Sequence, residues 1–219
     1  MNFSNRFVSE CREYSSYVQH VKAPVFRKSF VLKEGSQSGE ILICGLGFYD
    51  LFINGEKITK GYLAPYISNT DHIVYYDHYD LTPWLKAGEN VIGVMLGDGF
   101  QNSKTRVWDF MDNVFNSAPK LALSMKVESD GEKQEFDAMD FSCKKGPIFF
   151  NDLRSGVFFD KREEEKGWDQ PGFQEDENWH KPILADRPRG KAKLCEAEPI
   201  AVVEERKPVK IWKGALADY

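Results

Sequence analysis

The sequence predicts an all-β protein, a sandwich of short antiparallel strands, and three observations support this prediction. Asn54-Gly55 stands between two apolar runs and supplies the two positive-φ residues of a type I′ hairpin turn. Residues 121–127 alternate apolar and polar side chains, which is the period of a strand with one buried face. No segment sustains the 3.6-residue apolar period of a long helix, so a parallel α/β fold is disfavoured. Turn signals recur about every 8–12 residues, as in sandwiches and barrels.

Strands are expected along most of the chain. The run 41–45 is continuously apolar, which is typical of a strand buried on both faces. Residues 73–79 are rich in β-branched and aromatic side chains. Asp130-Gly131 is a second hairpin signal, directly after the alternating strand. Further strands are predicted at residues 30–32, 49–53, 91–96, 135–136, 141–143, 157–159, 200–203 and 209–212.

One short helical turn is predicted, at Thr82-Pro83-Trp84-Leu85. Thr82 would cap the turn and Gly88 would end it. Pro83 would occupy the first helical position, where its missing N–H costs nothing and its fixed φ suits a helix.

The chain divides into three segments. Residues 1–24 are polar with scattered aromatic side chains and form a lead-in segment, either a strand or a lid. Residues 25–186 form the sandwich domain. Asp186 begins a polar stretch with proline and glycine, so residues 187–219 are interpreted as a linker and the start of a following β region.

Composition excludes several classes of protein. The net charge is −5, so there is no basic excess to bind phosphates and no nucleic-acid partner is expected. No apolar run approaches the ~20 residues that span a bilayer, so no membrane partner is expected. The first residues lack an apolar signal core, so a natural start would imply a cytoplasmic protein and a cloning boundary would imply nothing. The four cysteines show no C-x-x-C spacing and are predicted to be free thiols.

Several motifs occur in an order that resembles a known family. They are Gly45-Leu46-Gly47-Phe48-Tyr49, Asn54-Gly55-Glu56, Leu63-Ala64-Pro65, Gly97-Asp98-Gly99, Gly167-Trp168 and Pro171-Gly172-Phe173 with Trp179. From about Val25 to Trp212 the chain resembles the N-terminal, sugar-binding-type β-sandwich of bacterial α-L-rhamnosidases. The resemblance implies a jelly-roll, galactose-binding-like sandwich. Tyr66-Ile67 and Phe100 depart from the family pattern at aromatic surface positions, which bears on ligand identity more than on fold.

The resemblance also implies a function. In such enzymes this domain precedes a helical barrel that holds the catalytic acids, and this chain has no helical periodicity to build that barrel. We therefore expect a non-catalytic accessory fragment of an α-L-rhamnosidase-like glycoside hydrolase, with no catalytic residue of its own. Its role would be to bind a carbohydrate of the L-rhamnose type or to pack against the downstream catalytic domain of the same polypeptide.

Three alternatives remain open at this stage. The domain could be a structural spacer without sugar affinity, or the sugar-binding sandwich of another glycosidase family. It could also be a complete small hydrolase, which would need two carboxylates ~5–10 Å apart across a sugar. Acidic residues are plentiful, but nothing in the sequence shows two of them converging.

Two loops are candidate sugar sites, because they combine aromatic surface with side chains that bond hydroxyls. The first is residues 66–72, with Asn69 and Asp71. The second is residues 101–116, a long turn-rich link of the kind that is often functional. Its candidate residues are Trp108 for stacking, Asp109 and Asn113 for hydroxyls, and Asp112 with Asn113 as oxygen ligands of a possible calcium ion.

Overall fold

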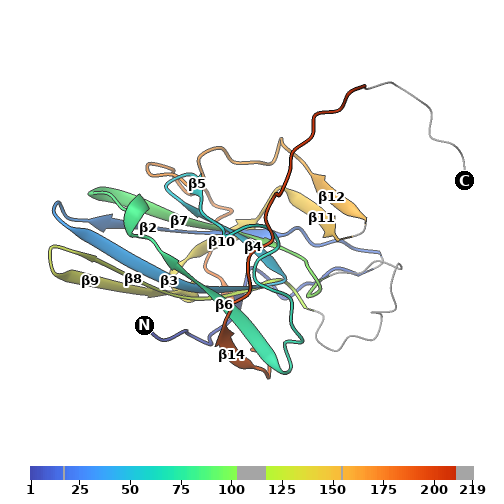
Figure 1. The fold of residues 1–219 in the computed structure, drawn as a ribbon, viewed down its shortest axis with the longest axis horizontal. Coiled ribbons are helices and arrows are strands. Elements are labelled where there is room, and N and C mark those ends of the chain that lie inside the picture. Colours follow the sequence, from blue (N-terminus) through green and yellow to red (C-terminus); the bar gives the residue numbers. More distant parts are fainter. Residues whose placement is uncertain (17, 103–116, 154, 211–219) are drawn as a thin grey trace, which may run out of the picture.

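In the described residues, two larger β-sheets pack face to face and a two-stranded hairpin lies beside them (Figure 1). The computed structural model describes residues 1–16, 18–102, 117–153 and 155–210. The first sheet has the order β13-β1-β8-β3-β6-β14, with β9 paired to β8. Its strands are β1 (Val8–Ser9), β3 (Gln37–Leu46), β6 (Ile73–Asp80), β8 (Lys120–Ser129), β9 (Glu132–Asp137), β13 (Ile183–Leu184) and β14 (Lys191–Leu194).

The second sheet has the order β10-β2-β7-β4-β5, and a separate hairpin pairs β11 with β12. The strand pairs of the second sheet and of this hairpin are all antiparallel. In the first sheet, β14 runs parallel to β6. The described ranges also contain two 3-10 turns, η1 (Thr82–Trp84) and η2 (Ala138–Asp140). The remaining strands are β2 (Pro24–Leu32), β4 (Phe48–Ile53), β5 (Glu56–Lys57), β7 (Gly88–Gly97), β10 (Ser142–Lys145), β11 (Ile148–Asp152) and β12 (Gly156–Phe159).

The core lies between the two sheets, because each strand turns alternate apolar side chains inward. Ile41 and Ile43 of β3 face Leu51 and Ile53 of β4 across one cluster, and all four side chains are completely buried. The predicted alternation of residues 121–127 is present in β8, where the apolar positions are buried. The prediction of an all-β sandwich is confirmed, and the finer jelly-roll assignment stays a prediction.

The Asn54-Gly55 hairpin has the predicted conformation. Asn54 has φ 52° and Gly55 has φ 86°, so both residues adopt the left-handed region that a type I′ turn requires. The Asn54 side chain also accepts a hydrogen bond from Val91 N at 2.9 Å and donates to Asn90 Oδ1 at 3.0 Å. The turn residue therefore anchors this hairpin to β7.

Two local predictions are wrong in detail. Thr82 is the first residue of η1 instead of its cap; Leu81 precedes the turn, and Asp80 Oδ1 accepts from Thr82 N at 2.9 Å. Residues 200–203 do not form a strand, since Ile200 makes an isolated bridge to Tyr62 and residues 201–203 are exposed and have no regular secondary structure. Residues 209–210 also lie outside any strand, and residues 211–212 are outside the described residues.

The lead-in segment contributes a strand instead of a lid. Val8 pairs with Leu121 of β8 and with Leu184 of β13, and Phe7 beside it is buried. All four cysteines are free thiols. In the ranges that the structure describes, no helix is long and apolar enough to cross a membrane.

Candidate functional site

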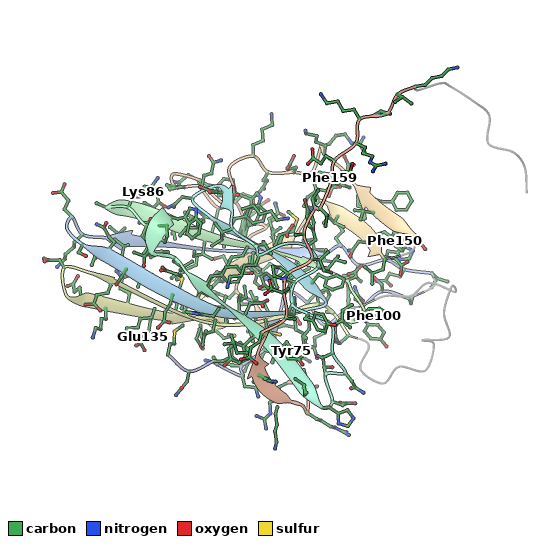
Figure 2. All side chains as sticks on the ribbon, in the orientation of Figure 1. Tyr75, Lys86, Phe100, Glu135, Phe150 and Phe159 are labelled. Atoms are coloured by element: carbon green, nitrogen blue, oxygen red, sulfur yellow. The ribbon has the colours of Figure 1, made fainter. Side chains whose placement is uncertain are left out.

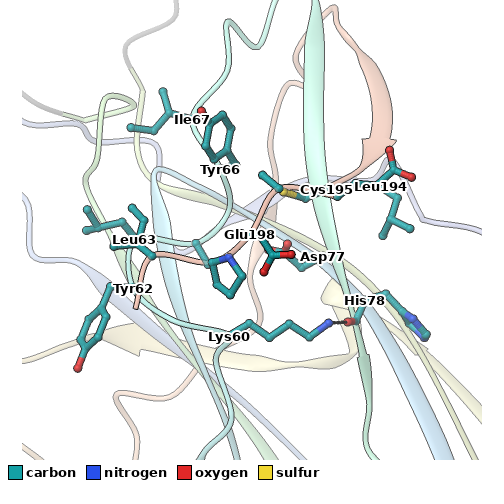
Figure 3. Close-up of a pocket in the computed structure, with 15 residues that line it drawn as sticks. Lys60, Tyr62, Leu63, Tyr66, Ile67, Asp77, His78, Leu194, Cys195 and Glu198 are labelled. Carbon is teal, nitrogen blue, oxygen red and sulfur yellow. Dashed lines mark hydrogen bonds between the residues drawn. The ribbon is translucent and has the colours of Figure 1, made fainter. Parts of the chain in front are cut away.

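A pocket of about 600 Å3 lies between the loop of residues 60–67, strand β6 and the segment of residues 194–200 (Figure 3). Most of its wall is apolar, and the loop supplies Leu63, Tyr66 and Ile67. Tyr66 and Ile67 are about half exposed, at 57% and 49%. Asp77, Lys60 and the exposed Glu198 add polar groups. Volume and lining are both typical of a small-molecule site.

The C-terminal strap, residues 195–200, forms one side of this pocket and is held at both ends. Its first residue, Cys195, donates its N–H to Tyr76 O at 2.8 Å, continuing the parallel pairing of β14 with β6. Its last residue, Ile200, accepts from Tyr62 N at 2.9 Å. A Cβ at Gly61 would overlap the Ile200 carbonyl, and Gly61 has φ 70°, so only glycine allows this close approach.

A chain of hydroxyl groups holds Asp77 at the pocket. Tyr49 Oη donates to Asp77 Oδ2 at 2.6 Å, and Tyr49 Oη lies 2.9 Å from Tyr79 Oη. Because the Tyr49 proton goes to Asp77, the Tyr79 hydroxyl must donate to Tyr49, and Lys60 N donates to Tyr79 at 3.2 Å. Burial raises the pKa of Asp77, while the Tyr49 hydrogen bond opposes that rise. Burial likewise raises the pKa of Tyr49 well above its ordinary value.

A second polar cluster surrounds Asp98, whose side chain is almost completely buried. Asn102 Nδ2 donates to Asp98 Oδ1 at 2.8 Å, and Asp98 N donates to Asn151 Oδ1 at 2.7 Å. Burial is the main cause that raises the pKa of Asp98 to about 7, and the negative charge of Asp152 adds to it. Burial keeps this carboxyl out of reach of a dissolved sugar, so we assign it a structural role.

Three neighbouring side chains, a cysteine, a histidine and a glutamate, are of the types that form a thiol nucleophile with its general base. Cys143 Sγ lies 3.8 Å from His180 Nδ1, and His180 Nε2 lies 3.2 Å from Glu10 Oε1. However, Cys143 is completely buried, and burial raises the pKa of its thiol to about 12. A reactive cysteine needs the opposite, an accessible thiolate, so this set does not form a catalytic site.

The hairpin of β11 and β12 carries an exposed apolar surface. All four residues of β12 are exposed, and three of them are large and apolar: Val157, Phe158 and Phe159. Phe150 of β11 contacts Phe158 with ring centroids 5.6 Å apart. Figure 2 shows Phe150 and Phe159 on this hairpin at the periphery of the molecule.

The structure places the predicted residues of the first loop in a tight turn. Asp71 N donates to Asn69 Oδ1 at 3.0 Å, and Asn69 O accepts from His72 N at 2.9 Å. Both side chains are exposed, and neither lines the pocket, although Tyr66 of the same loop does. They close the turn that leads into β6.

The predicted residues of the second loop, Trp108, Asp109, Asp112 and Asn113, lie outside the described residues, so sugar and calcium binding there stay predictions. In the described part of the chain, no three His, Cys, Asp or Glu residues gather as a metal site. Sequence reasoning missed Asp77 and the strap. An acidic residue in the middle of an aromatic strand, Tyr75-Tyr76-Asp77-His78-Tyr79, was an available signal for Asp77.

Comparison with known families gives one match over most of the chain. Residues 35–204 match the model of the α-L-rhamnosidase N-terminal domain. An α-L-rhamnosidase of Formosa agariphila is 30% identical over 205 residues, which is 90% of this chain and 21% of that protein. One from Streptomyces avermitilis is 30% identical over 136 residues, 61% of this chain and 13% of that protein. The chain thus spans about a fifth or less of these relatives.

Solved structures give the same result. The α-L-rhamnosidase from Dictyoglumus thermophilum superposes with a TM-score of 0.81 at 31% identity, covering 96% of this chain and 24% of that one. The enzyme from Aspergillus terreus superposes with a TM-score of 0.71 at 26% identity, covering 85% and 22%.

Proposed function

Since this chain belongs to the family of α-L-rhamnosidase N-terminal domains, we propose that it is a non-catalytic accessory domain of an α-L-rhamnosidase-like glycoside hydrolase. We propose further that its β11–β12 hairpin packs against the rest of that polypeptide. The relatives are several times longer than this chain, so in them a domain of this kind has neighbours in the same chain.

The exposed apolar surface of the hairpin carries the packing proposal. Val157 and Phe158 are 62% and 61% exposed, and Leu153 at the hairpin end is 44% exposed. Large exposed apolar side chains gathered on one hairpin are typical of sites of protein contact. A two-stranded hairpin is also marginally stable alone, so a neighbouring domain that covers it would stabilise it.

Hydrogen exchange tests the packing. In the full-length gene product, the amides of residues 148–159 should exchange more slowly than in the isolated chain. Phe158→Ser in the full-length protein should restore fast exchange there, because it removes apolar contact area. Val31→Ser is the matched control, since Val31 is equally exposed, at 65%, but belongs to β2. Equal exchange in the isolated and full-length proteins would contradict the packing proposal.

Activity measurement tests the non-catalytic role. The isolated chain should not hydrolyse aryl α-L-rhamnosides, because it spans only about a fifth or less of its α-L-rhamnosidase relatives. Glycoside hydrolysis needs two catalytic carboxylates, and the buried Asp98 cannot reach a sugar to serve as one of them. Turnover that survives purification and is lost in Asp98→Asn would show instead that the chain is a complete hydrolase.

A further inference from the structure

We propose that the pocket between the 60–67 loop and the C-terminal strap binds a neutral pyranose sugar. The apolar face of the sugar would lie against Tyr66, and its hydroxyl groups would bond to Asp77. This proposal is independent of packing through the β11–β12 hairpin, because the two surfaces share no residue.

The apolar side of the pocket suits the C–H face of a sugar ring. Tyr66 is exposed, and its ring makes an edge contact with Tyr75 at 6.1 Å between centroids, which orients it beside the pocket. Ile67, Leu63 and the strap's Pro199 extend the same apolar surface. Aromatic side chains stack on such faces because both partners lose unfavourable contact with water.

The polar side of the pocket offers the hydroxyl groups of a ligand an acceptor that is held in one position. Asp77 is fixed by Tyr49, which bonds to its Oδ2 atom, and Figure 3 shows the Asp77 side chain between β6 and the strap. A carboxylate accepts through about four lone-pair directions, so capacity remains for a ligand hydroxyl. A preorganised acceptor of this kind loses little entropy when it binds.

Charge decides between neutral and anionic ligands. The lining includes the acidic residues Asp77, Glu196 and Glu198. Among the described residues that line the pocket, Lys60 supplies a positive charge, and its Nζ already donates to His78 O at 2.6 Å. The net negative charge of the lining would therefore repel a sugar acid or a phosphate, but it would not repel a neutral sugar.

Chemical-shift mapping of the folded chain tests the proposal. L-Rhamnose, D-galactose and D-glucose are titrated into isotope-labelled protein, with D-glucuronate as the anionic comparison. At least one neutral sugar should bind with a millimolar Kd and shift the amides of residues 60–67 and 195–200. Glucuronate should bind more weakly than the best neutral sugar.

Two variants with matched controls complete the test. Tyr66→Ala should weaken binding about fivefold, because it removes a stacking ring. Asp77→Asn should weaken it about tenfold, because it removes the charge from a hydrogen bond. Tyr14→Ala and Asp71→Asn are the controls, since both side chains are exposed and neither lines the pocket. Circular dichroism checks that each variant is folded.

The proposal is overturned if the folded chain binds none of the neutral sugars. It is also overturned if binding shifts residues 101–116 instead of the pocket, which would place the site at the loop indicated by sequence. Unchanged affinity in both Tyr66→Ala and Asp77→Asn would refute it as well.

Discussion

The Tyr49 hydroxyl lies 2.6 Å from Asp77 Oδ2, although β4 and β6 belong to different sheets. Tyr49 is almost completely buried, and it crosses the interior of the sandwich to reach the carboxylate. With Tyr79 it forms a polar connection between the two sheets, directly beneath the pocket. The Tyr49–Asp77 hydrogen bond therefore connects the two sheets and also fixes a residue of the proposed sugar site.

Tyr49→Phe should destabilise the protein. The substitution removes the donor to Asp77 and the acceptor of Tyr79, so the partly buried Asp77 carboxylate and the buried Tyr79 hydroxyl each lose a partner, at a cost of about 1–3 kcal/mol. Urea unfolding measures this as a lower midpoint. Tyr14→Phe is the control, because the Tyr14 side chain is half exposed and should leave the midpoint in place. Equal midpoints for the two variants would refute the importance of the connection.

Asp98 should make stability decrease as pH rises. Its pKa is raised by burial from 3.8 to about 7 in the folded protein, so between these values the unfolded chain has released a proton that the folded chain retains. The free energy of unfolding should therefore fall from about pH 4 to about pH 7 and then level off, by ~1.4 kcal/mol per unit of pKa difference.

Asp98→Asn isolates this contribution. The variant keeps an oxygen for the Asn102 hydrogen bond but cannot ionise. Its free energy of unfolding should therefore not show the fall with rising pH that Asp98 causes. Asp71→Asn, at an exposed turn, should retain the decline of the native protein. Chemical unfolding at a series of pH values compares them. Superimposable profiles for the native protein and Asp98→Asn would contradict the raised pKa.

Glu175→Gln should cost about 2 kcal/mol of stability. Arg27 is 3% exposed, and its Nη1 donates to Glu175 Oε1 at 2.7 Å while its Nε donates to Trp168 O at 2.8 Å. Removal of the Glu175 charge takes away the carboxylate that contacts this buried guanidinium directly, which is costly. The cost is below that of a fully buried pair because water reaches Glu175, whose side chain is 33% exposed.

Glu204→Gln is the matched control for that substitution. Glu204 accepts from Arg206 Nε at 2.7 Å, but both side chains are mostly exposed, so the loss should stay below about 1 kcal/mol. Thermal or urea unfolding of the two variants gives the comparison. If the two variants lose similar free energies of unfolding, the burial of Arg27 does not make its ion pair with Glu175 stronger than an exposed pair.

Gly47→Ala should destabilise the protein by about 1–3 kcal/mol, because a Cβ at Gly47 would overlap the Asp98 carbonyl and the backbone would have to move. Gly131→Ala is the control. Gly131 has φ 77° but nothing within 4 Å of the added carbon, so its cost should be limited to backbone strain of ~1 kcal/mol. If Gly47→Ala loses no more free energy of unfolding than Gly131→Ala, the approach of Gly47 to the Asp98 carbonyl is not tightly packed.

Two glycine motifs that are separate in the sequence meet in the fold. They are Gly45-Leu46-Gly47 and Gly97-Asp98-Gly99, and Gly99 packs against Gly47. The motif pattern indicated only a family resemblance, and the contact between the two motifs depends on the pairing of β4 with β7. Likewise, Tyr66 was within a predicted site loop, whereas its neighbours Asn69 and Asp71 close a turn.

The sequence by itself determined the all-β class, the Asn54-Gly55 hairpin and the buried face of β8. These features depend on turn chemistry and on a two-residue period, and both are local properties of the chain. Only the tertiary structure decided that β14 pairs with β6, that the strap crosses beside Tyr66, and that Tyr49 reaches Asp77. Those contacts join residues distant in sequence, and strand order, which no local pattern specifies, brings them together.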